Sequence, residues 1–208
     1  MKIKDFSITT IFLSIILLLA FTPLGFIHLG VIKATIIHIP IIIASIILGP
    51  KIGAFLGFMF GLTSIAINTI TPTLLSFAFS PAIPVLGTSQ GSFWALFIAI
   101  VPRIIIGFIP YYIFKVIRNV ITKKKTNKKA ALFLTGLLTT FIHTFLVMGF
   151  ISLIFQDAYA EAINASSTNA IYKAILTVFF TNGLAEAILA GIVTMTVTPT
   201  LLQVSKKE

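Results

Sequence analysis

Cysteine is absent from this 208-residue sequence, and charged residues make up only 10% of it. Without cysteine the chain forms no disulfide bond, builds no metal site on thiolates and has no cysteine nucleophile. A soluble globular domain carries a charge on about a quarter of its residues. Because charge is this scarce, while 58% of the residues are hydrophobic and the mean hydropathy is +1.11, we expect the chain to fold within a membrane.

The sequence motifs of common enzymes are missing as well. There is no HExxH zinc-protease motif, no GxSxG nucleophile elbow and no glycine-rich phosphate loop. Acidic residues are too few for a catalytic carboxylate pair, and we find no pattern of metal ligands. We therefore expect neither an enzyme nor a bound cofactor or metal ion. Since no nucleotide site is recognisable, uphill transport by this chain would need ion coupling or a partner ATPase.

Long apolar stretches predict an all-α membrane protein, a bundle of six transmembrane helices. A helical span needs about 20 apolar residues, so the chain has room for six or seven spans and little else. We expect a single domain over residues 1–208, with a first span that is retained because it lacks a signal-peptide cleavage site. The predicted spans are 7–25, 35–49, 52–68, 92–118, 130–155 and 172–203.

Basic residues are distributed unevenly over the connections between these spans. The side with Lys33 and Lys173 also carries Asp157 and Glu161. The other side is strongly basic, so the positive-inside rule places it, with both termini, in the cytoplasm. The net charge of +10 thus reports orientation and predicts no nucleic-acid binding, although the cluster at 123–129 could also bind anionic lipid headgroups or an acidic partner. The basic residues of the cytoplasmic side are Lys2, Lys4, Lys51, Lys115, Arg118, Lys123, Lys124, Lys125, Lys128, Lys129, Lys206 and Lys207.

A long uncharged segment separates the third and fourth predicted spans. Residues 69–91 are rich in Thr, Ser, Pro and Gly and contain no charged residue. A loop of this length is uncommon in a compact protein unless it covers or lines a site. We expect a lid over an outward-facing substrate pocket, which the first loop, 26–34, also caps. The alternative is a plain surface loop.

Two charged residues, Arg103 and Glu186, fall inside predicted spans. A charge within the membrane is costly, so each residue is a candidate for a functional site. The two lie at similar depth, and one possibility is that they pair with each other. The other is that Arg103 faces a water-filled cavity and binds a substrate carboxylate, for which its planar guanidinium is well suited.

Three uncharged polar residues complete this candidate substrate-binding set: Asn68, His143 and Asn182. Asn182 and Glu186 are four residues apart and therefore share one helix face. Donors and acceptors of this kind suit a small polar solute. Each also has a structural alternative, since Asn68 can cap its helix and His143 can bond a neighbouring backbone. His38, by contrast, is expected at the outer membrane interface.

The second and third predicted spans carry a recognisable pattern. Ile39-Pro40 leads through an apolar run to the turn Leu48-Gly49-Pro50-Lys51, and Ile52-Gly53-Ala54 and Gly57-Phe58-Met59-Phe60-Gly61-Leu62 follow. This pattern resembles the second-to-third helix hairpin of S components, the substrate-binding subunits of energy-coupling factor (ECF) vitamin transporters. The six-helix architecture with cytoplasmic termini that this family implies agrees with our topology over essentially the whole chain.

Two further segments resemble the pantothenate-type members of this family. They are Ser76-Phe77-Ala78-Phe79-Ser80-Pro81 and Val101-Pro102-Arg103-Ile104-Ile105-Ile106-Gly107. The resemblance implies a subunit that captures pantothenate outside the cell with high affinity. Pantothenate is an anion with hydroxyls and an amide, which suits an arginine accompanied by amide side chains. The alternatives are an S component for another vitamin, such as a pyridine, pyrimidine or flavin compound, and a solitary ion-coupled carrier.

The resemblance also implies protein partners. S components associate in the membrane with a transmembrane coupling protein and two ATPases that drive transport. They contact the coupling protein through small residues four apart on the first helix, which allow close helix approach. The matching positions here are Thr10 and Ser14, where the family usually has alanines.

Overall fold

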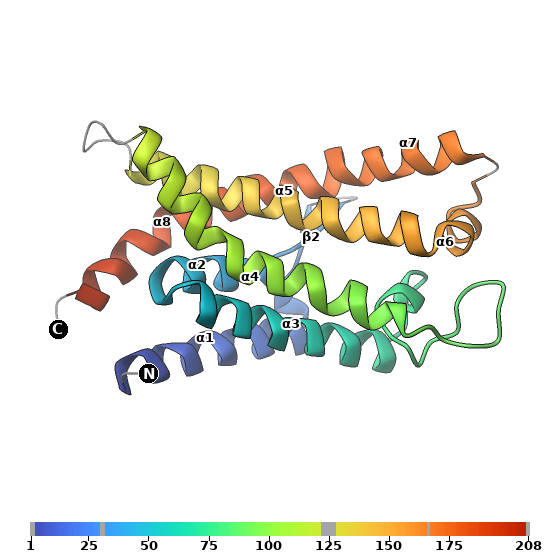
Figure 1. The fold of residues 1–208 in the computed structure, drawn as a ribbon, viewed down its shortest axis with the longest axis horizontal. Coiled ribbons are helices and arrows are strands. Elements are labelled where there is room, and N and C mark those ends of the chain that lie inside the picture. The colour runs from blue at the N-terminus through green and yellow to red at the C-terminus, as the bar shows by residue number, and fades with distance from the viewer. Residues whose placement is uncertain (1–2, 30–31, 122–127, 166, 207–208) are drawn as a thin grey trace.

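The computed structural model describes residues 3–29, 32–121, 128–165 and 167–206. They form an elongated bundle in which the long helices run along the longest axis of the molecule (Figure 1). Five helical stretches are long and apolar enough to cross a membrane, and a sixth apolar helix is shorter, so the predicted α-helical membrane bundle is confirmed. The five are α1 (Ile3–Phe21), α3 (Pro50–Ile70), α4 (Trp94–Ile121), α5 (Lys128–Ile154) and the continuous stretch of α7 (Thr168–Val178), η4 (Phe179–Gly183) and α8 (Leu184–Lys206).

The shorter apolar helix is α2 (His38–Leu48), which has 11 residues. At about 1.5 Å per residue it is about half as long as the hydrocarbon layer is thick. The expected span 35–49 is too long, because the residues before α2 form a hairpin of β1 (Phe26–Leu29) and β2 (Ile32–Thr35). The sequence predicted a loop at 26–34, because hydropathy alone gives no signal for the pairing of two such short strands.

The hairpin lies beside the middle of the bundle in Figure 1, where α2 begins. Its two strands pair in antiparallel fashion, with Phe26 opposite Thr35, and the backbone N–H of Ile36 donates to the carbonyl of Gly25 over 3.0 Å. Backbone groups inside a membrane protein need such internal partners. The paired strands thus supply hydrogen-bond partners for backbone groups that precede α2 and are not helical.

The turn between α2 and α3 is as tight as predicted. Gly49 adopts a φ of 91°, which favours glycine, and Pro50 begins α3. From there α3 packs closely against α4, since a Cβ atom at Gly53 would collide with the carbonyl of Gly107 and one at Gly57 with the carbonyl of Arg103. The glycines of α3 therefore bring the backbone around Arg103 into direct contact with α3.

The last predicted span contains an irregularity. Between α7 and α8 the chain forms a five-residue π-helix, η4, that includes Asn182. Such π-segments inside α-helices occur frequently at functional sites. The expected continuous span is therefore present, and the change of helical type occurs beside one of the predicted site residues.

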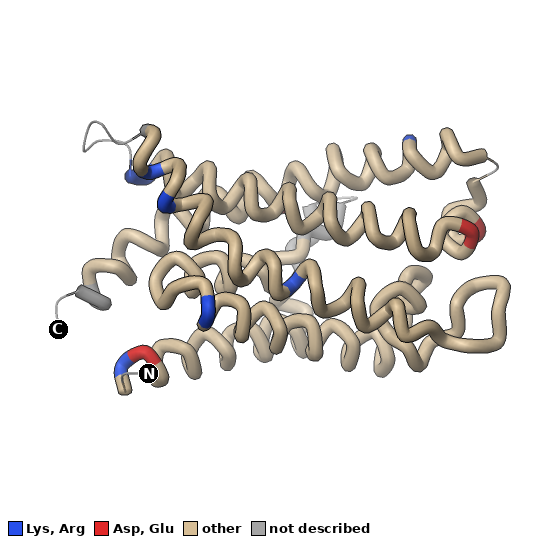
Figure 2. Tube along the Cα trace, in the orientation of Figure 1, with Lys and Arg blue, Asp and Glu red and all other residues tan. Residues whose placement is uncertain are grey.

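The charged positions are segregated along the bundle. Figure 2 shows basic positions gathered at the end that holds both termini and the α4–α5 connection, with the acidic positions of α6 (Gln156–Ala162) at the opposite end. This distribution agrees with cytoplasmic termini under the positive-inside rule. Lys2, Lys123, Lys124, Lys125 and Lys207 lie outside the described residues, as do the side chains of Lys33 and Lys206.

Two hydrophobic clusters divide the interior of the bundle. One joins α1, α2, α3 and α8 and includes Ile106 of α4 and Leu132 of α5. The other joins α4, α5, α6 and the segment between α3 and α4, and includes Ile98 and Val147. Along α4 and α5, the residues between these clusters include Arg103 and His143. The candidate polar residues therefore lie between two apolar layers.

Candidate substrate-binding site

Arg103 is buried in the bundle, with only 6% of its surface exposed. Its Nη1 donates to the carbonyl of Ile98 over 2.7 Å, and its Nη2 lies 3.5 Å from the hydroxyl of Ser64 on α3. The guanidinium carbon lies 5.6 Å from the ring centre of Phe60 and 4.9 Å from that of Phe79. In the part of the chain that the structure describes, none of these contacts is made with a carboxylate.

The two charges inside the membrane do not pair with each other. Glu186 instead accepts a hydrogen bond of 2.7 Å from the backbone N–H of Thr35, at the end of β2. It therefore ties the hairpin to the beginning of α8. The first possibility, an ion pair between Arg103 and Glu186, is therefore absent from the structure, and binding of a substrate carboxylate by Arg103 stays a prediction.

One edge of the Arg103 guanidinium carries a donor without a hydrogen-bond partner among the described residues. Nε is buried and has no hydrogen-bond partner among the described residues. Nε–H and Nη2–H lie on the same edge of a guanidinium, while Nη1 is engaged by Ile98 on the other side. Two parallel donors of this kind match the two oxygens of a carboxylate. Nη2 has a long contact with the Ser64 hydroxyl, so Nε–H is the donor of this edge that is left unpaired, in a buried position.

Asn68 connects α3 to the uncharged segment that follows it. Its Nδ2 donates to the carbonyl of Ser64 over 2.8 Å, and its Oδ1 accepts a bond of 2.7 Å from the hydroxyl of Ser76. A second connection joins Thr69 to Ser80 through their hydroxyls, 2.6 Å apart. These bonds correspond to the structural alternative for Asn68, and they also place it two hydrogen bonds away from Arg103 through Ser64.

The uncharged segment packs over Arg103. Phe77 is 1% exposed and Ser80 is fully buried, so residues 76–80 belong to the packed interior. Residues 87–91 of the same segment are exposed, and the chain before α4 extends beyond the end of the bundle in Figure 1. The ring of Phe79 covers the guanidinium of Arg103. A cation held against aromatic faces is stabilised electrostatically. Part of the uncharged segment thus lies against Arg103, and whether the segment acts as a lid stays a prediction. Phe79 and Phe60 are contacts of Arg103 that the sequence analysis did not name.

His143 stacks on a second histidine, His38. Their ring centres are 5.9 Å apart with an interplanar angle of 28°, and Nε2 of His38 lies 3.1 Å from the hydroxyl of Thr140. His38 is 1% exposed, so its expected place at the membrane interface is wrong. The physical reason is that the short helix α2 begins inside the bundle, where His38 packs against α5, and not at the membrane surface. A histidine within an apolar run was the signal in the sequence.

Asn182 and Glu186 belong to another part of the interior. The π-helix that carries Asn182 contacts β2 and α5, and Asn182 makes no side-chain hydrogen bond to a described residue. No direct contact joins either residue to Arg103 within the described ranges. The structure thus brings Arg103 close to Asn68 and Ser64, and joins His143 to His38, while Glu186 holds the hairpin.

Thr10 and Ser14 are both exposed on α1. The buried residues of this helix, among them Phe12 and Ile16, occupy the opposite side. The hydroxyl of Thr10 donates to the carbonyl of Phe6 over 3.0 Å, so its polarity is satisfied within the helix. These two positions therefore present small side chains outward, on a surface where another helix can approach.

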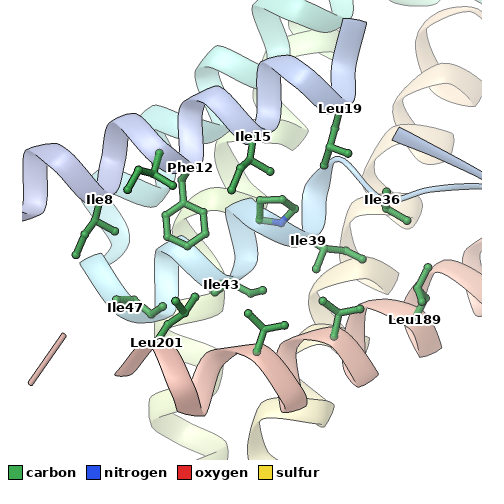
Figure 3. Close-up of a pocket in the computed structure, with 14 residues that line it drawn as sticks. Ile8, Phe12, Ile15, Leu19, Ile36, Ile39, Ile43, Ile47, Leu189 and Leu201 are labelled. Carbon is green, nitrogen blue, oxygen red and sulfur yellow. The ribbon is translucent and has the colours of Figure 1, made fainter. Parts of the chain in front are cut away.

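A lateral groove of about 570 Å³ lies at a different place, between α1, α2 and α8. Figure 3 shows Phe12, Ile39, Ile43 and Leu189 around it, and its lining is apolar throughout. It offers no hydrogen bond and no charge to a polar solute. The groove therefore does not suit an anionic substrate, and the polar interior around Arg103 remains the candidate site.

Comparison with known proteins agrees with this architecture. The sequence matches the family described as "ECF transporter, substrate-specific component" over residues 4–198. It is also 36% identical, over 202 residues, to the protein named "Pantothenic acid transporter PanT" of Lactococcus lactis subsp. cremoris (strain MG1363). That match covers 96% of this chain and 94% of the relative. Both matches are to transport proteins, and together with the apolar helices they identify a multi-pass protein of the cell membrane.

Both matches extend over almost the whole chain, so the similarity includes the entire helical bundle and not only one motif. The chain belongs to the substrate-specific components, or S components, of the ECF transporters.

Proposed function

We propose that this protein is the high-affinity subunit that captures pantothenate for an ATP-driven ECF transporter. The observation that carries the proposal is the buried guanidinium of Arg103, whose Nε–H has no hydrogen-bond partner and which has no carboxylate partner among the described residues. A buried charge without a counter-charge is costly. A ligand carboxylate would supply the missing charge. The name of the Lactococcus lactis relative supports pantothenate as the source of that carboxylate.

In this proposal the remaining polar residues recognise the uncharged part of the vitamin. His143, Asn182, Asn68 and Glu186 offer donors and acceptors for its hydroxyls and amide. Asn68 and Glu186 already hold the lid and the hairpin, so they would bind substrate while they position these two elements. The chain would act as one substrate-binding domain, 1–208, without a bound cofactor or metal ion.

Transport would require partners that this chain lacks. We propose that the exposed face with Thr10 and Ser14 docks onto a transmembrane coupling protein, which connects to two ATPase subunits. Small side chains allow two helices to approach closely within a membrane, where packing rather than the hydrophobic effect drives association. The protein would then bind the vitamin by itself and move it only within the complete transporter.

Calorimetry on the detergent-purified protein tests the substrate. We expect tight binding of pantothenate, and much weaker binding of the alcohol analogue in which a hydroxymethyl group replaces the carboxylate. Arg103→Ala should lower pantothenate affinity at least about 100-fold, because it removes two charge-assisted hydrogen bonds. Arg118→Ala, on the cytoplasmic part of the same helix, is the matched control and should bind as the wild type does.

The outcomes separate the parts of the proposal. Absence of pantothenate binding, with another vitamin bound in its place, would contradict the substrate and leave the family unchanged. Equal binding of pantothenate and its alcohol analogue would contradict the role of Arg103. Concentrative uptake by this chain alone in vesicles would contradict the need for an ATPase and favour a solitary carrier.

A further inference from the structure

The stacked histidines form a polar cluster inside the bundle. His38 comes from the first residue of α2 and His143 from the middle of α5, so the cluster joins two elements that are far apart in the sequence. The contact between α2 and α5 occurs at this place, and His38 is almost entirely buried there. Polar side chains inside a bundle require partners, which makes the hydrogen bonds of the two rings informative.

The hydrogen bonds of Thr140 define the tautomer of His38. The Thr140 hydroxyl donates its proton to the carbonyl of Gly136 over 3.0 Å. It can therefore only accept in its contact of 3.1 Å with Nε2 of His38. Nε2 thus carries the proton, and in the neutral ring Nδ1 is left as an acceptor. His38 consequently offers a lone pair, not a proton, to any further partner.

One nitrogen of the second ring, His143, has no hydrogen-bond partner among the described residues. Nε2 of His143 is buried and makes no hydrogen bond within the described part of the chain. The ring stacks on His38, and like Arg103 it lies between the two hydrophobic clusters, on a helix that packs against α4. An unpaired nitrogen of this kind, in the region of the proposed carboxylate anchor, marks a position that a polar ligand atom can fill.

We propose that His38 and His143 together recognise a hydroxyl group of the substrate, and that His38 is a specificity-determining residue. This inference rests on the proposed function, in which Arg103 binds the carboxylate. A hydroxyl both donates and accepts, so it can donate to Nδ1 of His38 and also bond Nε2 of His143. A carboxylate can only accept and would leave Nδ1 unpaired. In pantothenate the hydroxyls lie at the end away from the carboxylate, so the two ends bind different groups.

The test compares two ligands across variants of the purified protein. One ligand is pantothenate, and the other is a deoxy analogue that lacks one of its two hydroxyls. Of the two possible deoxy analogues, the test uses the one that binds the wild type more weakly than the other does. His38→Gln places an amide near the position of Nε2, so it keeps a donor to Thr140 and removes the acceptor at Nδ1. We expect the wild type to prefer pantothenate about 5- to 10-fold, as one neutral hydrogen bond would give, and His38→Gln to bind both ligands alike.

Thr139→Val is the matched control. Thr139 is also buried on α5, and its hydroxyl has no partner among the described residues, so this variant removes a neighbouring hydroxyl outside the proposed contact. It should keep the wild-type preference. If His38→Gln does not purify as a folded protein, Thr140→Val serves instead and should reduce the same preference, because it removes the group that orients His38.

The possible results point to different conclusions. A preference for pantothenate that survives in His38→Gln, or an equal loss of affinity for both ligands, would overturn the role of His38 and indicate simple packing. Deoxy analogues that all bind the wild type as tightly as pantothenate would overturn it too. A wild type that binds no pantothenate would contradict the proposed function itself, and the histidine assignment with it.

Discussion

Arg103 shows how much one side chain in a membrane protein depends on its surroundings. Its Nη1 is held by the carbonyl of Ile98 and its plane by the rings of Phe60 and Phe79, so the open edge has a defined orientation before any ligand binds. A donor that is already oriented loses less conformational entropy on binding. The proposed role therefore requires the shape of a guanidinium and not only its charge.

Arg103→Lys tests this requirement. Lysine keeps the positive charge but has no planar pair of donors. We expect pantothenate affinity to fall about 10- to 100-fold in calorimetry, which corresponds to about 1.4–2.7 kcal/mol. Arg118→Lys is the control on the same helix. Binding within about twofold of the wild type would show that charge alone is sufficient.

Phe79→Leu tests the contact between lid and guanidinium. A cation–π contact contributes about 0.5–2 kcal/mol, and its loss should let the lid open more readily. We expect ligand to dissociate about 3- to 10-fold faster, measured by stopped-flow fluorescence of Trp94, the single tryptophan, at the start of α4. Phe93→Leu, at a ring that is 85% exposed, is the control. An unchanged dissociation rate would argue against a lid.

The close packing of α3 against α4 positions the site through contacts between the two helix backbones. Gly57 lies against the carbonyl of Arg103, and Gly53 against Gly107, so the two helix backbones touch at these points. Small residues at helix interfaces allow such an approach in membranes. The position of Arg103 therefore depends on residues that carry no functional group.

Gly57→Ala should separate the two helices locally. The added methyl group would collide with the backbone of α4, and overpacking of this kind typically costs about 1–3 kcal/mol. We expect a lower melting temperature in detergent and weaker pantothenate binding. Gly149→Ala is the control, because a Cβ atom there meets nothing within 4 Å. Equal melting temperatures for the two variants would contradict the packing argument.

In the whole molecule, substrate binding and docking to the coupling protein are assigned to different regions. The polar interior would bind substrate, while the exposed face of α1 with Thr10 and Ser14 would dock onto the coupling protein. Because these regions do not overlap, damage to one should leave the other intact. This separation distinguishes a subunit that shares its transport machinery from a carrier that works alone.

Thr10→Leu and Ser14→Leu test the docking face. A bulky side chain would prevent close helix approach without reaching the interior. We expect pantothenate binding to remain within about twofold of the wild type, and uptake by cells that express the complete transporter to fall at least about 10-fold, as about 1.4 kcal/mol of lost association would cause. Thr177→Leu, at another exposed threonine with a similar intrahelical bond, is the control. Unchanged uptake in both variants would place the docking surface elsewhere.

The membrane class and the helical bundle followed from the sequence, because they depend on local quantities. Apolar runs of sufficient length predict spans, and the distribution of lysines predicts orientation, whatever the helices pack against. The tight turn at Gly49-Pro50 is equally local, since glycine permits a positive φ and proline fixes its own φ, whatever the rest of the chain does. Charge inside a span likewise marked Arg103 without any knowledge of its neighbours.

The partners of these residues could only be decided by the tertiary structure. Whether Arg103 pairs with Glu186 depends on how α4 and α8 are placed, and the answer lies in the bond of Glu186 to Thr35. The burial of His38 depends on how α2 packs beside the hairpin, whereas the sequence predicted only a loop at 26–34. A sequence pattern reports what each residue prefers, whereas contacts between distant segments arise when the whole chain packs. The composition therefore determined the solvent and the topology of this protein, and packing alone determined which polar groups were left for a ligand.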